Sequence, residues 1–127
     1  MAHASAVTVF VAAALAGCVP HLMTRDDLLT RLRRDLDEAR APPPVVYLDK
    51  DEPEDLSPLR GMKLDEIEAA LGEPFCRARG AHRCFDDADL VYLFFPTPPG
   101  VIPGGPTLRV YSDRHGICRG ASWIITE

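Results

Sequence analysis

Long apolar runs and positive charge are both scarce in this chain. The apolar run at the N-terminus, residues 4–15, has about a dozen residues, whereas a membrane-spanning helix needs roughly twenty. The sequence therefore predicts no membrane-spanning helix. The formal net charge is −5, and nucleic-acid binders are usually basic, so the composition argues against a nucleic-acid partner.

The first seventeen residues contain no Asp, Glu, Lys or Arg and lead into a short small-residue motif. Residues 4–15 have the length of a signal-peptide core, and Ala16 and Gly17 are small enough for a peptidase to approach the backbone. Residues 15–18, Leu-Ala-Gly-Cys, resemble the lipobox of bacterial lipoproteins. The resemblance implies cleavage between Gly17 and Cys18 and acylation of Cys18. Acyl chains anchor stably because each buried methylene contributes about 0.8 kcal/mol.

The residues after the motif predict where in the cell the protein lies and how the chain divides into segments. Val19 stands where an acidic residue often retains lipoproteins in the inner membrane. By resemblance to lipoprotein sorting in enteric bacteria, we expect the periplasmic face of the outer membrane. Residues 1–17 are expected to be a signal peptide, 18–55 a lipidated N-terminus with a charged helix and a linker, and 56–127 a small domain.

The chain has four cysteines, and the expected compartment is oxidising. If Cys18 carries lipid, Cys76, Cys84 and Cys118 remain, which allows one disulfide and one leftover thiol. A Cys76–Cys84 bridge, which closes a short loop, is the first choice. A Cys84–Cys118 bridge and the absence of any bridge are the alternatives.

Residues 25–40 predict a separate amphipathic helix. Thr24 is a good N-cap, and Asp26 and Asp27 complement the helix dipole in the first turn. Acidic and basic side chains repeat at i,i+4 spacing, which is typical of an exposed helix. The apolar stripe is thin: Leu28, Leu29, Leu32, Leu36 and Ala39. Three prolines at 42–44 end the helix, and the acidic residues 49–55 are expected to form a solvated linker.

The remainder predicts an α+β domain. A second helix is expected from about residue 64, ended by Gly72 and Pro74. Strands are expected at 90–95, 107–112 and 117–126, with a turn at 113–116 and a Pro- and Gly-rich loop at 96–106. Residues 45–48 are a further short β-prone run. The expected fold is a helix, or two short helices, packed on a three-stranded antiparallel meander.

Residues 61–74 form a motif, Gly-Met-Lys-Leu-Asp-Glu-Ile-Glu-Ala-Ala-Leu-Gly-Glu-Pro. It resembles the signature of SmpA/OmlA/BamE-type outer-membrane lipoproteins. The matching positions are Gly61, Met62, Glu66, Ile67, Leu71, Gly72 and Pro74, whereas Lys63 departs by replacing a capping Ser or Thr. The resemblance implies a lipobox, a flexible N-terminal stretch, helices that bear the motif and a three-stranded sheet. It also implies a role in stabilising the β-barrel assembly machinery or in the cell envelope.

The sequence offers candidate residues for contacts with a partner but none for catalysis. Serines lack a nucleophile context, carboxylates cluster in linkers and on an exposed helix face, and the histidine and cysteine spacing is not that of a metal site. We therefore expect no catalytic residue, no metal and no cofactor. Partner-contact candidates are the apolar pair Val101 and Ile102 at a loop tip and the basic residues Arg77, Arg79 and Arg83.

The strand at 90–95 is apolar on both faces, although one helix covers only one face of a sheet. The second face therefore needs a cover, which we expect to be the helix at 25–40, another subunit, a client protein or a local fold-back. The sequence thus favours a non-enzymatic scaffold anchored in the membrane by N-terminal acyl chains, with a protein partner in the cell envelope. The alternatives are a periplasmic redox- or metal-responsive protein that uses Cys76, Cys84 and Cys118, and a small secreted hydrolase inhibitor.

Overall fold

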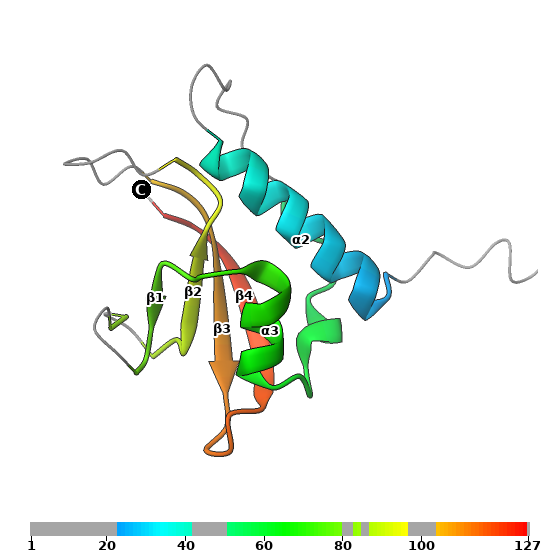
Figure 1. Ribbon diagram of the computed structural model, residues 1–127, viewed down its shortest axis with the longest axis vertical. Coiled ribbons are helices and arrows are strands. Elements are labelled where there is room, and N and C mark those ends of the chain that lie inside the picture. Colours follow the sequence, from blue (N-terminus) through cyan, green and yellow to red (C-terminus); the bar gives the residue numbers. More distant parts are fainter. Residues whose placement is uncertain (1–22, 42–50, 80–82, 85–86, 97–103, 127) are drawn as a thin grey trace, which may run out of the picture.

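Two helices lie against the same face of a four-stranded antiparallel sheet (Figure 1). The computed structural model describes residues 23–41, 51–79, 83–84, 87–96 and 104–126. The helices are α2 (Arg25–Arg40) and α3 (Leu64–Leu71), with the 3-10 turn η1 (Ser57–Leu59) between them. The strands are β1 (Cys76–Arg77), β2 (Leu90–Leu93), β3 (Gly105–Ser112) and β4 (Cys118–Thr126).

The sheet order is β1-β2-β3-β4, and every neighbouring pair is antiparallel. The α+β class is confirmed, but the expected number of three strands is wrong because β1 adds a fourth. With two residues, β1 is too short for side-chain alternation to reveal it. β3 begins at Gly105, so the last residues of the expected 96–106 loop belong to a strand. The β-prone run 45–48 lies outside the described residues.

Helix α2 begins and ends where the sequence predicts. The Thr24 hydroxyl accepts a hydrogen bond from the Asp27 N–H at 3.1 Å, which satisfies one of the free donors of the first turn. On the outer side, Arg33 and Asp37 form an ion pair at 3.1 Å with the expected i,i+4 spacing.

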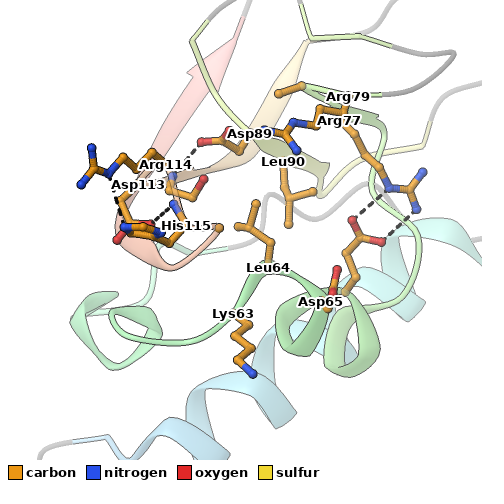
Figure 2. A pocket seen from close by; sticks show the side chains of 14 residues that line it. Lys63, Leu64, Asp65, Arg77, Arg79, Asp89, Leu90, Asp113, Arg114 and His115 are labelled. Carbon is orange, nitrogen blue, oxygen red and sulfur yellow. Dashed lines mark hydrogen bonds and ion pairs between the residues drawn. The ribbon is translucent and has the colours of Figure 1, made fainter.

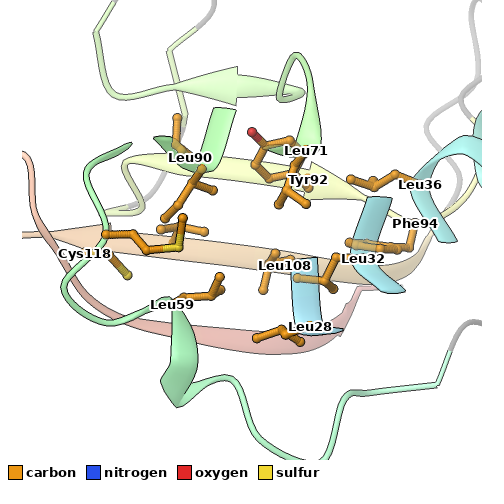
Figure 3. Packing of buried hydrophobic residues seen from close by; sticks show 13 residues of the cluster. Leu28, Leu32, Leu36, Leu59, Leu71, Leu90, Tyr92, Phe94, Leu108 and Cys118 are labelled. Atoms are coloured by element: carbon orange, nitrogen blue, oxygen red, sulfur yellow. The ribbon is translucent and has the colours of Figure 1, made fainter. Parts of the chain in front are cut away.

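The expectation that this helix is separate from the domain is wrong. Leu28, Leu32 and Leu36 are fully buried in one cluster with Tyr92, Phe94 and Leu108 of the sheet (Figure 3). Periodicity identifies which face of a helix is apolar, but it does not identify what that face packs against. The thin stripe suffices here because it packs against a sheet that α3 covers only in part.

The arginines of α2 connect the helix to the segments around it. Arg25 donates to the carbonyl oxygens of Pro58 and Arg60, each at 2.8 Å, and Arg40 donates to the Glu73 carbonyl at 2.8 Å. Arg31 donates to the Asp51 carbonyl at 3.0 Å. These side chains satisfy carbonyl groups that lie outside regular structure, and they hold the chain that precedes and follows α3 against α2.

The acidic segment is therefore only partly the solvated linker that the sequence predicts. Asp51, Glu52 and Glu54 are exposed, but Pro53 is buried. The Asp55 carboxylate accepts hydrogen bonds from the Ser57 N–H at 2.9 Å and from its hydroxyl at 2.8 Å. These bonds hold the pKa of the Asp55 carboxyl below its usual value.

Helix α3 carries the 61–74 motif, and each motif position has a structural role. The Glu66 carboxylate accepts from the Lys63 N–H at 3.2 Å, which compensates in part for the missing Ser or Thr cap. Gly72 ends the helix at φ +86°, and Gly61 adopts φ +85°. Gly61 donates its N–H to the Cys118 carbonyl at 2.9 Å, which ties the motif to β4.

If α2 belongs to the core, truncating its stripe must destabilise the whole fold. We expect Leu32→Ala to lower the free energy of unfolding by about 2–5 kcal/mol, because it leaves a cavity in the cluster. Leu29→Ala is the matched control and should cost less, because the Leu29 side chain is only half-buried. Urea denaturation of both variants measures the difference, and an unchanged midpoint for Leu32→Ala would contradict this placement of α2.

Candidate protein-interaction surfaces

A cleft of about 430 Å³ opens between the N-terminus of α3, strand β1 and the β3–β4 turn (Figure 2). Leu64 and Leu90 lie at its centre, and charged side chains surround them. Arg77 and Arg79, two of the expected contact residues, lie on one side. Asp113, Arg114 and His115 of the turn lie on the other. The cleft thus has a small apolar floor and a rim of mixed charge.

Arg77 is bonded within the protein. Its guanidinium donates to both Glu68 carboxylate oxygens, at 2.9 and 3.0 Å, in a bidentate pair that joins β1 to α3. The hydrogen bond to Glu68 raises the pKa of Arg77. The expected contact residue is therefore also a structural link. Its partner lies nine positions earlier on a different element, so sequence spacing does not identify it.

Two carboxylates around the cleft hold the β3–β4 hairpin. Asp113 Oδ1 accepts from the His115 N–H at 2.8 Å and from the Ile117 N–H at 3.1 Å. These backbone bonds, the one from Ile117 foremost, keep the pKa of Asp113 below its usual value. Asp89 accepts from the Ser112 N–H at 2.7 Å. Gly116 has φ +76°, as the predicted 113–116 turn requires.

The first-choice disulfide is present. Cys76 and Cys84 are bonded, with their Cα atoms 5.1 Å apart, and the bridge fixes β1 to the segment that returns toward β2. Arg79 and Arg83 are exposed near the bridge, and their role as contact residues stays a prediction. The other contact candidates, Val101 and Ile102, lie outside the described residues.

Cys118 is the leftover thiol, and it is buried with 2% of its surface exposed. Its Sγ lies 3.5 Å from the Gly120 carbonyl oxygen, and burial raises the pKa of the thiol. Because the thiolate is the reactive form, this environment makes Cys118 inert. Within the described ranges, no group of three His, Cys, Asp or Glu side chains could hold a metal ion.

Tyr92 is a structural link that the sequence does not reveal. Its hydroxyl donates to the Gly72 carbonyl at 2.9 Å, so β2 satisfies the backbone where α3 ends. Burial raises the pKa of Tyr92 well above its usual value. In the sequence, Tyr92 is one more apolar-compatible residue in a β-prone run, and nothing marks it as a hydrogen-bond donor to α3.

Helix α2 does not cover the second face of the sheet. The expectation that the helix at 25–40 covers this face is therefore wrong. Both helices lie on the face that carries Tyr92, Phe94 and Leu108. On the opposite face, Thr107 is buried and lies between Leu93 and Ile124 in the strand register, and both of these neighbours are half-buried. Another subunit, a client protein and a local fold-back stay predictions for this face.

Comparisons with protein-family models, with curated proteins and with solved structures give no match. Among the described helices, neither is long and apolar enough to cross a membrane.

Thiol counting tests the cysteine assignment. In a Cys18→Ser background, the folded protein should take up no alkylating label, because Cys118 is buried and its pKa is raised. Unfolding without reductant should expose one thiol, and reduction should release two more. Mass spectrometry reads each count. Three thiols that label without reductant would instead favour the redox- or metal-responsive alternative.

Proposed function

We propose that this protein is a non-enzymatic lipoprotein, anchored through acylated Cys18 at the periplasmic face of the outer membrane, that acts as a protein-interaction scaffold. The observation that carries the proposal is the Cys76–Cys84 disulfide in a small domain that follows a Leu-Ala-Gly-Cys motif. Structural disulfides persist in oxidising compartments, and the motif resembles the lipobox that directs export and acylation of bacterial lipoproteins.

The motif at 61–74 supports a more specific proposal, in which the chain acts like the SmpA/OmlA/BamE-type lipoproteins in outer-membrane protein assembly or envelope integrity. Its two glycines occupy positive-φ positions, where other residues are strained. Ile67 and Leu71 are buried against the sheet, and Pro74 is buried after the helix end. The motif therefore needs glycine where φ is positive and apolar residues where the side chain is buried.

The use of the carboxylates favours a scaffold over an enzyme. Glu68, Asp89 and Asp113, which line the cleft by α3, each bond to groups inside the protein. A general acid or base needs a free proton-transfer position within hydrogen-bond reach of a substrate. Here the carboxylates hold β1 and the β3–β4 hairpin in place. The outer surfaces of these elements are available for contacts with a partner.

Lipid labelling in cells tests the anchor. The native chain should incorporate labelled palmitate and sediment with the outer membrane, whereas Cys18→Ser should lose the label and be released in soluble form. Cys118→Ser is the matched control and should keep the label, because Cys118 is buried in the folded domain. In-cell crosslinking should then join the anchored protein to an envelope protein.

A mature product that begins at Met1 and carries no acyl mass would contradict the proposal. Recovery of the chain only as an uncrosslinked monomer from intact envelopes would contradict its scaffold part while leaving the anchor in place.

A further inference from the structure

Strand β4 forms one edge of the sheet, and most of its outer side has no backbone partner among the residues that the structure describes. Its only strand neighbour among the described residues is β3. At its start, Cys118 bonds to the backbone of Gly61 and Met62, at 2.9 and 2.7 Å. From Ala121 to Ile125, the described part of the chain supplies no backbone partner on the outer side.

The register identifies which backbone groups face outward. The Pro106 carbonyl accepts from the Phe94 N–H of the β2 side at 2.9 Å, so the next residue, Thr107, faces β4 and its partner Ile124. In an antiparallel ladder successive residues face opposite sides. Ile124 and Ser122 therefore face β3. The N–H and C=O groups of Ala121, Trp123 and Ile125 face outward.

A groove borders this edge. Residues 52–57 and Arg60 line a cleft of about 290 Å³ together with Gly120 and Ala121 of β4. The following turn, η1, lies beside β4 at the side of the sheet away from β1 (Figure 1). The acidic segment thus forms one wall of the groove, and the open strand edge forms the other.

The wall is negatively charged. Glu52 and Glu54 are exposed, and neither has an ion-pair partner within the described residues. Asp55 is bonded to Ser57 and lies near Arg60, the only cation among the groove-lining residues. Arg119, the nearest cation on β4, instead donates to the Ser112 carbonyl at 3.1 Å and lies over the Tyr111 ring.

We propose that this groove binds an extended, basic segment of a partner protein, which adds to the sheet as a fifth strand beside β4. The outward groups of Ala121, Trp123 and Ile125 supply the main-chain hydrogen bonds, as in other cases of strand addition. Glu52 and Glu54 attract lysine or arginine side chains of the segment. The Ile125 side chain, 61% exposed, offers it an apolar contact.

The charge of the groove favours this occupant over a second copy of the chain. Natural edge strands are protected from self-association by charges or prolines, and residues 120–126 have neither. Pairing two β4 edges would, however, bring two acidic walls together, and like charges repel. A basic segment removes that conflict. The inference rests on the proposed scaffold function and assigns it a partner class and a surface.

The test uses the full-length chain and synthetic nine-residue peptides that alternate lysine and valine. Amide hydrogen exchange, followed by NMR, should slow about tenfold or more at Ala121, Trp123 and Ile125 when the peptide binds, because each outward N–H gains a partner. Exchange at Ser122 and Ile124 should change little, because these N–H groups already bond to β3. A peptide with glutamate in place of lysine, and one N-methylated along one edge, should give no protection.

Charge variants supply the second measurement. We expect Glu54→Lys to weaken lysine-peptide binding about fivefold or more at low salt, since it turns an attraction into a repulsion. Glu73→Lys makes the same charge change at another exposed position, near β1, so it is the matched control and should leave affinity unchanged. The loss of affinity in Glu54→Lys should shrink as salt rises.

Three outcomes would overturn the inference: protection that appears elsewhere, equal binding of the glutamate peptide, or edge protection that rises with protein concentration alone. The last would assign the edge to a second copy. None of these results depends on Cys18, so failure here would leave palmitate labelling and in-cell crosslinking intact.

Discussion

The packing of three α2 leucines on the sheet is the interaction on which the rest of the structure depends. Leu28, Leu32 and Leu36 close the core over Tyr92 and Phe94. Once the helix is held there, its arginines reach the carbonyl groups of the acidic segment and of the residues around η1. Those segments in turn border β4. The groove beside the sheet edge therefore depends on the burial of the α2 leucines, because this burial places the arginines that hold the acidic segment.

Several polar side chains stabilise the fold by connecting its elements. The Arg77–Glu68 pair joins β1 to α3, and the Tyr92 hydroxyl joins β2 to the end of α3, whereas the Asp113 carboxylate holds the local turn between β3 and β4. The disulfide adds a covalent link to the short β1, and a core this small benefits from such a constraint. Within the described residues, the outward backbone groups of β4, the acidic wall beside them and the mixed-charge cleft by α3 are the surfaces on which the proposed partner could bind.

Local features could be predicted from the sequence, whereas tertiary placement could not. The Thr24 cap, the α2 bounds, the end of α3 at Gly72 and the 113–116 turn follow from rules that involve only neighbouring residues. The position of α2, the strand β1 and the bond from Tyr92 to Gly72 depend on contacts between distant segments, which periodicity does not encode. The Cys76–Cys84 bridge could be ranked first because its loop is short. Acylation, the location and the resemblance of the 61–74 motif stay predictions.

Native-state hydrogen exchange tests most directly whether α2 is part of the cooperative core. The amides of Leu32 and Leu36 should exchange only through global unfolding, with the same opening free energy as those of Leu108 and Val110 in β3. The same denaturant dependence should apply to all four. The account would be contradicted if the α2 amides opened at a clearly lower free energy while the β3 amides stayed protected. The helix would then not belong to the cooperative core, and it could not hold the acidic segment beside β4.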